Sequence, residues 1–342
     1  MSTGILAIPI LASFFVVLFL TPFWIRKAKQ IGLVWDDMNK LNSKKIAGSG
    51  GIMTICGFII GVLLYIAYVV FILGKYNFRL IEIFALLNVI LILAGVGLID
   101  DLLGWRMGGL SRRSRLILVA FAAIPLMAIN AGKSIVSLPF IGMVDLGLIY
   151  PLIMIPIGIA GATYTFNMLA GFNGLEAGQG IILIGAVSIV AYIMGNSWLT
   201  IIGLCMVVAL CAFLFYNFYP AMVFPGDSLT YCVGGLIAVI SILGNFEKIA
   251  LFFFLPYIIE VVLKSRGKLI KQSFGLPKED GSLDLRYDKI YGLEHASIAL
   301  MKKLGIKPTE KKVVFSIWGI QIIIVIIGFL IFGKGIMEYA NQ

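Results

Sequence analysis

The chain has 342 residues, of which 61% are hydrophobic and 13% are charged, and its mean hydropathy is +1.04. Soluble domains carry about 25% charged residues, so the composition excludes an ordinary soluble domain, and the high hydrophobicity excludes a disordered chain. The formal net charge of +10 indicates basic residues gathered at one membrane face before it indicates nucleic acid, and we expect no nucleic-acid partner.

Ten apolar stretches follow one another along the chain, each near the length that a helix needs to cross a bilayer. They cover residues 4–24, 48–73, 80–99, 115–130, 148–167, 178–194, 198–216, 229–244, 249–263 and 313–333. The sequence therefore predicts an all-α polytopic membrane protein with about ten transmembrane helices, in which residues 1–342 form one integral-membrane domain. Nine or eleven spans are the alternatives, because several stretches are short or contain Gly and Pro.

Lysine and arginine are divided unequally between the two sets of loops that ten spans create. The loops 25–47, 100–114, 168–177, 217–228 and 264–312, with Arg115 at the edge of one, hold 22 of the 27 basic residues, and the opposite side holds 5. Basic residues mark cytoplasmic loops. We therefore expect these loops, including the long loop 264–312, on the cytoplasmic face and both termini outside the cytoplasm.

Acidic residues stand out in the first two of these loops. The loop 31–51 contains Asp36 and Asp37 and by itself is typical of a solvated loop. Asp100 and Asp101 follow the third apolar stretch and are expected to end that helix. Acids oppose the macrodipole at a helix C-terminus, and the next segment is basic, so the pair predicts either a plain helix end or a site for a divalent cation and anionic ligands.

Residues 163–180 read TYTFNMLAGFNGLEAGQG and combine many glycines with polar side chains. Glycines allow tight turns, and free backbone N–H groups can hold phosphate oxygens. Helix packing through small residues would also explain the glycines, but it would not explain Asn167, Asn173, Glu176 and Gln179. We therefore expect this segment to contribute to a ligand site.

Asp227 follows Pro225 and Gly226 and precedes an apolar stretch, in the segment FYPAMVFPGDSLTY. Asp is favoured at the N-cap of a helix, so Asp227 is a candidate cap of the next helix. An Asp can cap a helix and also bind metal, so the two roles are compatible. All these segments fall in the loops assigned to the cytoplasmic side. One site on that face is the simplest interpretation.

Taken together, these segments resemble the polyprenyl-phosphate N-acetylhexosamine-1-phosphate transferase superfamily, also called the glycosyltransferase 4 family, over most of the chain. The match is closest to its UDP-GlcNAc–dolichyl-phosphate GlcNAc-1-phosphotransferase branch. The motifs that carry the resemblance are NMLAGFNGLEAGQG at 167–180, FPGDSLTYCVGG at 224–235, GLIDDLLGWR at 97–106 and DMNK at 37–40. The peptidoglycan branch is disfavoured, because its histidine-rich motif cannot exist in a chain with one histidine.

The resemblance implies transfer of an N-acetylhexosamine 1-phosphate, first expected to be GlcNAc 1-phosphate, from a UDP-sugar to a polyprenyl (dolichyl) phosphate with release of UMP. This is the first membrane step of lipid-linked oligosaccharide assembly for protein N-glycosylation. It implies Mg²⁺ as cofactor, with Mn²⁺ as a substitute, bound by Asn167 and Asp227. Asp100, Asp101 and Asp227 would be catalytic, the adjacent pair acting either as a base or as orienting groups.

The resemblance also implies two sets of substrate contacts. Those to the UDP-sugar are Asp36, Asp37, Met38, Asn173, Arg266, Gly267 and Lys268, with Lys271 as a rival for the basic cluster. Those to the lipid phosphate are Arg112, Arg113, Ala160, Gly161, Ala162, Thr163, Tyr164, Thr165, Phe166, Asn167 and Met168.

Three positions depart from the pattern of the superfamily. Gly104 stands where relatives often have Asn, Tyr164 replaces an Asn, and Gly48 replaces a Glu thought to help bind the nucleotide sugar. Another UDP-sugar or an undecaprenyl acceptor therefore remains an alternative. A transporter is a second one, disfavoured because Glu82 and Glu260, the only acids inside predicted spans, have no obvious partners. We expect a prokaryotic, for example archaeal, cell membrane rather than the ER membrane, and a homodimer is left open.

Overall fold

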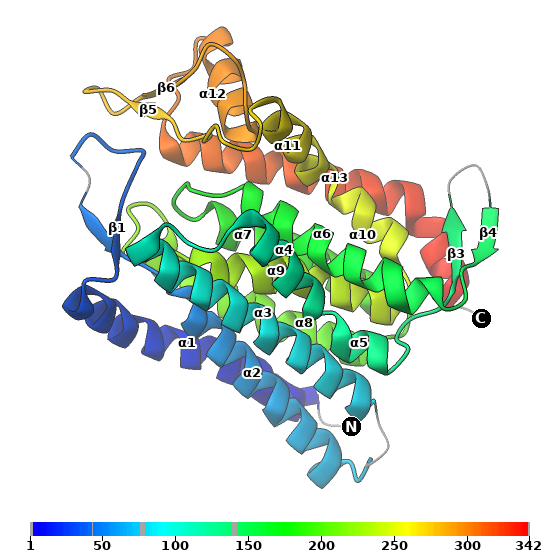
Figure 1. The fold of residues 1–342 in the computed structure, drawn as a ribbon. Helices are drawn as coiled ribbons and strands as arrows, with labels where there is room; N and C mark the ends of the chain where they lie inside the picture. Colours follow the sequence, from blue (N-terminus) through cyan, green and yellow to red (C-terminus); the bar gives the residue numbers. More distant parts are fainter. Residues whose placement is uncertain (1–2, 43, 76–78, 139–141, 341–342) are drawn as a thin grey trace.

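The computed structural model describes residues 3–42, 44–75, 79–138 and 142–340, and its helices run side by side in one bundle (Figure 1). The long helices are α1 (Thr3–Ile31), α2 (Gly51–Ala67), α3 (Leu80–Met107), α6 (Ile155–Met168), α7 (Leu175–Ile193), α8 (Ser197–Asn217), α9 (Gly226–Gly244) and α13 (Glu310–Ala340). The shorter helices are α4 (Arg112–Phe121), α5 (Ile124–Ala128), α10 (Glu247–Phe253), α11 (Leu255–Arg266) and α12 (Leu293–Lys303), with π-helical turns at Tyr68–Ile72 and Tyr150–Met154.

Three small antiparallel hairpins complete the described structure. They pair β1 (Val34–Asp36) with β2 (Lys45–Ala47), β3 (Ile135–Leu138) with β4 (Gly142–Asp145), and β5 (Leu276–Pro277) with β6 (Leu283–Asp284). In the first hairpin Trp35 lies opposite Ile46. Ala47 of β2 also accepts a hydrogen bond from the backbone N–H of Phe224, at 2.8 Å, which ties this hairpin to the segment before α9.

Eight helices in the described part of the chain are long and apolar enough to cross a membrane, which confirms a polytopic membrane protein. Two of the ten predicted stretches, 115–130 and 249–263, instead form the pairs α4–α5 and α10–α11. Pro125 and Pro256 stand in the first turn of the second helix of each pair. Proline lacks a backbone N–H and favours a helix start, which accounts for both breaks. Ten spans and their orientation stay predictions.

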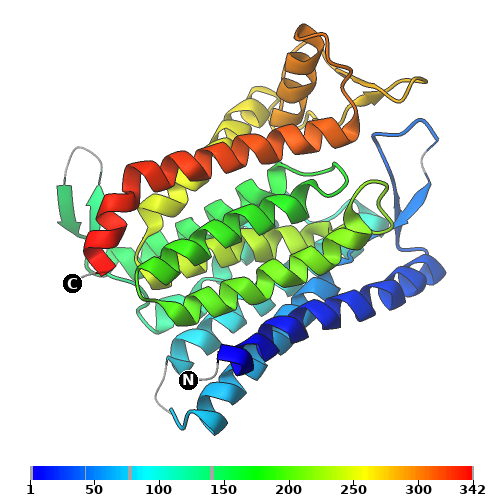
Figure 2. The ribbon, with the colours of Figure 1, turned by 180° about the vertical axis from the view of Figure 1, so that it is seen from behind.

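The loops predicted to be cytoplasmic gather at one end of the bundle. Hairpins β1–β2 and β5–β6, helix α12, and the connections α6–α7 and α8–α9 lie toward that end, whereas hairpin β3–β4 and the drawn chain ends lie toward the other (Figures 1 and 2). The division by basic residues therefore corresponds to a spatial division in the molecule.

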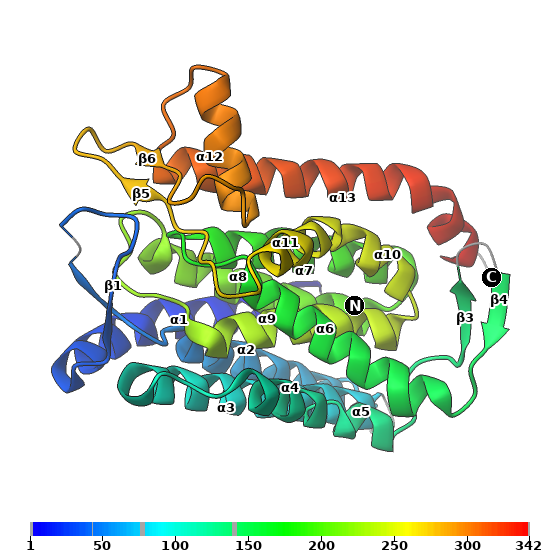
Figure 3. The ribbon, with the colours of Figure 1, turned by 45° about the horizontal axis from the view of Figure 1, so that its top comes forward.

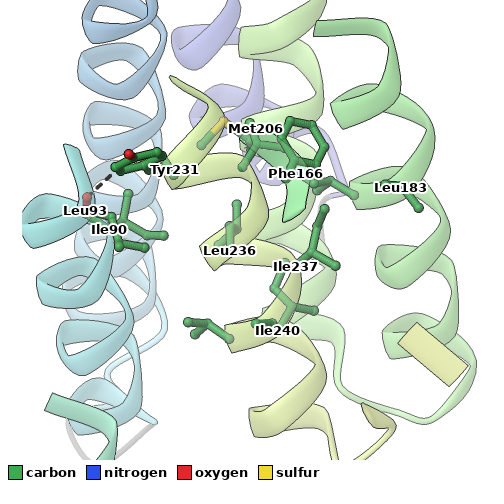
Figure 4. Packing of buried hydrophobic residues seen from close by; sticks show 14 of the residues in the cluster. Ile90, Leu93, Phe166, Leu183, Met206, Tyr231, Leu236, Ile237 and Ile240 are labelled. Carbon is green, nitrogen blue, oxygen red and sulfur yellow. Dashed lines mark hydrogen bonds between the residues drawn. The ribbon is translucent and has the colours of Figure 1, made fainter. Parts of the chain in front are cut away.

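Helix α9 forms the centre of the core and packs between α3 and α6. Ile90 and Leu93 of α3 face α9 on one side, and Phe166 of α6 faces it on the other (Figure 4). A Cβ on Gly234 would lie 2.6 Å from the carbonyl oxygen of Ala162, so only glycine permits this approach of α6 and α9. The close packing fixes the relative positions of the C-terminal ends of α3 and α6 and the N-terminal end of α9.

The prediction that α3 ends at Asp100 and Asp101 was wrong. The helix continues to Met107 and stops at Gly108, whose φ of 82° is the left-handed conformation common at helix C-termini. Asp100 and Asp101 are 2% and 9% exposed. Because partners inside the protein satisfy both carboxylates, the helix does not need to end at water there.

Candidate active site

A cavity of about 280 Å³ lies where the C-terminal end of α3 and the N-terminal ends of α4 and α9 meet hairpin β1–β2. Its lining consists of Trp35, Ser49, Asp100, Asp101, Gly104, Arg115, Phe224, Gly226 and Asp227. The structure therefore brings the three acids predicted to be catalytic into the wall of one cavity. Asn167 joins them from α6 through a hydrogen bond to Asp227.

Asp101 caps helix α9 from a different helix. Its Oδ1 accepts the backbone N–H of Asp227 at 2.7 Å, and its Oδ2 accepts that of Ser228 at 3.4 Å. Satisfying these N–H groups is the work of an N-cap side chain. The alternative in which Asp227 itself caps α9 is therefore wrong, since Asp227 lies inside the first turn of α9 and its side chain is hydrogen-bonded to Asn167.

Asp100 forms an ion pair and two hydrogen bonds with groups from three parts of the chain. Its Oδ2 lies 2.5 Å from Nε of Arg115 and accepts the hydroxyl of Tyr231 at 3.1 Å, while its Oδ1 accepts the backbone N–H of Leu110 at 2.8 Å. A buried carboxylate needs such compensation. Asp100 therefore holds Arg115 at the cavity, and both carboxylate oxygens of Asp100 already have partners within the protein.

Asn167 and Asp227 form the pair predicted to bind metal. Nδ2 of Asn167 donates to Oδ1 of Asp227 at 2.7 Å and to the hydroxyl of Thr230 at 2.8 Å. Within the described residues, no hydrogen bond engages Oδ1 of Asn167 or Oδ2 of Asp227. One amide oxygen and one carboxylate oxygen are therefore available to coordinate a ligand, and Mg²⁺ binds oxygen atoms of both kinds.

These two oxygens fit a Mg²⁺ ion that is bound by the protein and a phosphate substrate together. In the described part of the chain, no group of three or more His, Cys, Asp or Glu side chains converges as a metal cage. Mg²⁺ commonly takes one or two protein ligands and completes its octahedron with waters and substrate phosphates. The residues present would hold the ion only together with such a substrate.

The glycine-rich turn between α6 and α7 does not offer all of its N–H groups to a ligand. The N–H of Gly171 donates to Oε1 of Glu176 at 2.8 Å, and that of Asn173 donates to Oε1 of Glu310 at 2.8 Å. Both carboxyl groups are buried. The expectation that these N–H groups cradle phosphate therefore fails at two positions, where protein carboxylates already hold them.

The DMNK loop lies against this turn. Nδ2 of Asn173 donates to Oδ2 of Asp37 at 3.1 Å, and the Lys40 ammonium lies 2.5 Å from the same oxygen. Asn39 donates to the carbonyl of Gly171 at 2.8 Å. The structure thus brings together Asp37 and Asn173, two residues predicted to contact the UDP-sugar. Met38 is joined to the long loop, because its carbonyl accepts Nη2 of Arg286 at 2.9 Å.

Trp35 accounts for two of the three departures from the superfamily pattern. Its indole lies against Gly48, where a Cβ would be 2.5 Å from Nε1, and against Gly104, where a Cβ would be 3.6 Å from the ring. The indole therefore fills space beside two positions that lack side chains. It lines the cavity together with Phe224, so this chain has an aromatic wall there.

The end of α6, predicted to contact the lipid phosphate, presents two different faces. Ala160, Thr163 and Phe166 are buried, and Phe166 stacks on Tyr257 with ring centroids 5.2 Å apart. Gly161 is exposed, and the Tyr164 hydroxyl donates to the carbonyl of Arg112 at 3.2 Å. Only part of the segment 160–168 is therefore positioned to meet a ligand.

The basic residues predicted to contact phosphates lie outside the cavity. Arg112 donates from its guanidinium to the carbonyls of Lys268 and Leu269, and Arg113 is exposed. The cavity lining contains none of Asp36, Met38, Arg112, Arg113, Arg266, Gly267 and Lys268. Arg115, which the sequence analysis had not selected, is the arginine of this stretch that lines it.

Sequence reasoning missed Arg115, Tyr231, Trp35 and Glu310. For Arg115 a signal existed, because it closes the basic run SRRSR, and Ser111 accepts the N–H of Ser114 at 3.1 Å as the N-cap of α4. Placing the helix start at Ser111 puts Arg115 one turn further into α4, on nearly the same face as Arg112 and away from that of Arg113. Tyr231 and Glu310 carried no local signal, because their partners are distant in sequence.

Comparison with known proteins places the geometry in context. A family model described as glycosyl transferase family 4 matches residues 83–245. The chain is 35% identical over 327 residues to a Saccharolobus solfataricus protein provisionally named UDP-N-acetylglucosamine–dolichyl-phosphate N-acetylglucosaminephosphotransferase, covering 95% of this chain and 96% of the relative. The Dictyostelium discoideum protein of that name is 29% identical, over 72% of this chain and 67% of its own length.

A bacterial relative extends the comparison. A Bacillus subtilis protein provisionally named undecaprenyl-phosphate N-acetylglucosaminyl 1-phosphate transferase is 28% identical over 250 residues, covering 72% of this chain and 65% of the relative. The matched region of the family model contains Asp100, Asp101, Arg115, Asn167 and Asp227. These five residues thus fall within the region that matches the family model, whereas Trp35 and Ser49, which also line the cavity, lie before it.

Proposed function

The chain belongs to glycosyl transferase family 4, and from that premise we propose that it transfers N-acetylglucosamine 1-phosphate from UDP-N-acetylglucosamine to a polyprenyl phosphate, with dolichyl phosphate as the first acceptor to test. The proposal rests on the similarity along nearly the whole chain to the Saccharolobus protein. In the transfer, an oxygen of the lipid phosphate bonds to the β-phosphorus of the UDP-sugar. The bond from that phosphorus to the oxygen of the α-phosphate breaks, and UMP leaves.

One observation in the structure carries the assignment of the site. Asp227 and Asn167, from two different helices, each keep one oxygen without a hydrogen-bonding partner in the described residues, beside a cavity that Arg115 also lines. Phosphoryl transfer depends mainly on positioning and on neutralising charge on phosphate oxygens. A cation-binding pair next to an arginine supplies both requirements.

Mg²⁺ is the cofactor that we propose, with Mn²⁺ as a substitute. Asn167 and Asp227 would hold the ion, and when bound it would neutralise charge on the pyrophosphate of the donor. Arg115 would bind a phosphate of the donor or of the acceptor. The ion pair between its Nε and Asp100 holds the guanidinium in place at the cavity. In this proposal Arg115 takes the phosphate-binding role that the sequence analysis gave to Arg112 and Arg113.

Asp100 and Asp101 act, in this proposal, as orienting groups. Both oxygens of each carboxylate already accept hydrogen bonds or an ion pair from within the protein. The second pKa of a phosphate monoester is near 6, so a lipid phosphate is mostly a dianion at pH 7 and does not require a strong base. Asp101 positions Asp227 through α9, and Asp100 positions Arg115.

The remaining assignments follow the same premise. Asp37, Met38 and Asn173 would lie beside the UDP-sugar, and the exposed part of the segment 160–168 beside the lipid phosphate. The reaction would be the first membrane step of lipid-linked oligosaccharide assembly. We place the enzyme in a prokaryotic cell membrane with its site facing the cytoplasm, a choice supported by the archaeal relative and by the distribution of basic residues.

The experiment that tests the proposal follows phosphate rather than sugar. Purified protein is incubated with Mg²⁺, dolichyl phosphate and UDP-N-acetylglucosamine labelled in the β-phosphate, and label in the organic extract is compared with UMP in the aqueous phase. We expect equal amounts of both, and loss of both with EDTA or with Asp227→Ala. Asp280→Ala, which removes an exposed acid of the long loop, is the matched control.

Two outcomes would change the proposal. Release of UDP in place of UMP would mean sugar transfer without phosphate and would refute the mechanism. Turnover with undecaprenyl phosphate alone would replace the acceptor and keep the reaction, in line with the Bacillus relative. Other UDP-sugars, tested in the same assay, decide the identity of the hexosamine.

A further inference from the structure

On one side of the bundle, exposed apolar side chains along two helices are followed by basic side chains at the ends of those helices. Helix α6 lies between α4 and α11 on this side (Figure 3). Leu116 and Ile117 of α4, like Ile259 and Val262 of α11, are exposed. Both helices then have basic residues at their cytoplasmic ends, which is the arrangement expected where a helix leaves the hydrocarbon and reaches the headgroups.

The chain leaves α11 at this level in a turn that presents two apolar side chains. Lys268 and Leu269 have φ of 54° and 58°, values that residues other than glycine rarely adopt. Leu269 and Ile270 are 41% and 69% exposed. Arg112 of α4 holds the turn by donating to the carbonyls of Lys268 and Leu269, at 3.4 and 3.0 Å. The apolar pair is therefore held outward by a fixed turn.

The basic side chains of this turn and of the first two positions of α4 have no acidic partners in the described part of the chain. The cations are Arg112, Arg113, Arg266, Lys268 and Lys271, and none of them forms an ion pair with any residue that the structure describes. Elsewhere in the same loop, Lys278 and Lys302 are both paired with Asp284. Two of the unpaired cations make other contacts, because Lys271 lies 4.6 Å from the centroid of the Tyr287 ring and Arg112 donates to backbone carbonyls. One part of the loop thus neutralises its cations with acids of the protein, and the other carries cations that no acid of the described residues neutralises.

We propose that residues 266–271, with Arg112 and Arg113, form a docking surface for the anionic headgroups of the bilayer, into which Leu269 and Ile270 insert. Segments that pair exposed apolar side chains with basic residues bind at the boundary of headgroups and acyl chains. Anionic lipids of the cytoplasmic leaflet attract such cations. The charge of the surface selects this partner over a neutral one.

The surface also gives the basic cluster at 266–268 a role other than binding the UDP-sugar. The lining of the 280 Å³ cavity includes none of these residues. Anchoring the turn would hold Arg112, and through the Tyr164 hydroxyl the end of α6, at the level of the headgroups. This inference does not depend on the proposed reaction, and its test requires no turnover.

The test measures depth in reconstituted vesicles. Ile270→Cys is labelled with an environment-sensitive fluorophore, and the signal of identically treated parent protein, which has four native cysteines, is subtracted. Leu304→Cys is the matched control, because Leu304 is 63% exposed on the cytoplasmic side just beyond α12. Quenching by brominated lipid and by aqueous acrylamide is measured in phosphatidylglycerol and in phosphatidylcholine vesicles.

At position 270 we expect a blue-shifted emission, strong quenching by brominated lipid and weak quenching by acrylamide, and the reverse at position 304. The lipid quenching at position 270 should fall in phosphatidylcholine and with Lys268→Ala/Lys271→Ala. The double variant Lys289→Ala/Lys303→Ala, with the same change of charge at exposed sites, should leave it unchanged. Equal acrylamide quenching at positions 270 and 304 would overturn the proposal and assign the surface to a soluble partner, and insensitivity to lipid charge would overturn the role of the cations.

Discussion

Two groups of acidic side chains lie at the same end of the molecule and are satisfied in different ways. Asp100, Asp101 and Asp227 are held by backbone N–H groups, an amide and an arginine from other helices and from the connection between α3 and α4. Asp280 and Asp284 lie in the long loop and pair with the lysines 278, 302 and 307. The first group depends on how helices pack, and the second on local loop structure.

The difference indicates where a substitution has consequences. Breaking a buried charged network leaves uncompensated groups and costs about 3–5 kcal/mol, whereas exposed ion pairs contribute about 0–1 kcal/mol. Buried acids with fixed partners also keep their orientation when a charged substrate enters. We therefore expect function to follow the first group and to be nearly independent of the second.

Asp227→Asn should cause the largest loss. The amide keeps the size of the side chain and its ability to accept from Asn167, but it removes the charge that would help to hold a divalent cation. We expect turnover to fall by about 100-fold or more, as for other preorganised electrostatic groups, with little change in thermal stability. The assay of β-phosphate transfer measures it, and Asp280→Asn should retain wild-type activity. An active Asp227→Asn enzyme would remove Asp227 from the site.

Arg115→Lys should come next. Lysine keeps the charge but has no guanidinium fork, so it cannot bond to Asp100 through Nε while also facing the cavity. We expect kcat/KM to fall by about 10-fold to 100-fold, and binding of the charged substrate to weaken. Arg113→Lys, at an exposed position of the same helix, is the control. Equal activities of the two variants would contradict the assignment of Arg115 as the phosphate-binding arginine.

Gly97→Ala tests the packing on which the buried group depends. A Cβ at this position would lie 2.6 Å from the backbone of Asp227, where α3 and α9 approach each other. We expect a destabilisation of about 1–3 kcal/mol, typical of overpacking, and a loss of turnover because Asp101 no longer reaches the N-terminus of α9. Gly95→Ala, whose Cβ would meet nothing within 4 Å, is the matched control. Similar thermal unfolding of both variants would contradict the close approach.

Trp35→Ala should have a smaller effect on the same cavity. Removing the indole opens space beside Gly48 and Gly104 and takes away one aromatic wall, without touching the hydrogen bonds of the acids. We expect a rise of about 10-fold in the KM for the UDP-sugar, the order of one lost aromatic contact of 1–1.5 kcal/mol, and a nearly unchanged kcat. A fall in kcat with constant KM would instead place Trp35 near the reacting atoms.

The sequence predicted the elements of this fold better than their partners. The apolar pattern located the eight long apolar helices of the described residues, together with two stretches that form pairs of shorter helices. The motifs located Asp100, Asp101, Asn167 and Asp227. Both signals are local. The sequence did not reveal that Asp101 caps α9, since the partners are 126 residues apart and meet only through the packing at Gly97. In the same way, Arg115 could be chosen over Arg112 as the arginine that lines the cavity only once the position of α4 in the fold was known.

Asp284→Asn should have the smallest effect and completes the comparison. Hydrogen bonds from Lys278 and Lys302 hold the pKa of Asp284 below its usual value. A lowered pKa in the folded state stabilises the protein above the unfolded-state pKa, about 3.9, and this contribution is lost as the pH falls through the folded-state value. We expect the variant to lose less than about 1 kcal/mol at pH 7, with the difference from wild type shrinking below about pH 4. Thermal unfolding in detergent from neutral to acidic pH measures it, with Asp288→Asn as the exposed control. A large loss of activity at pH 7 would show that the loop acids, like the buried ones, serve the site.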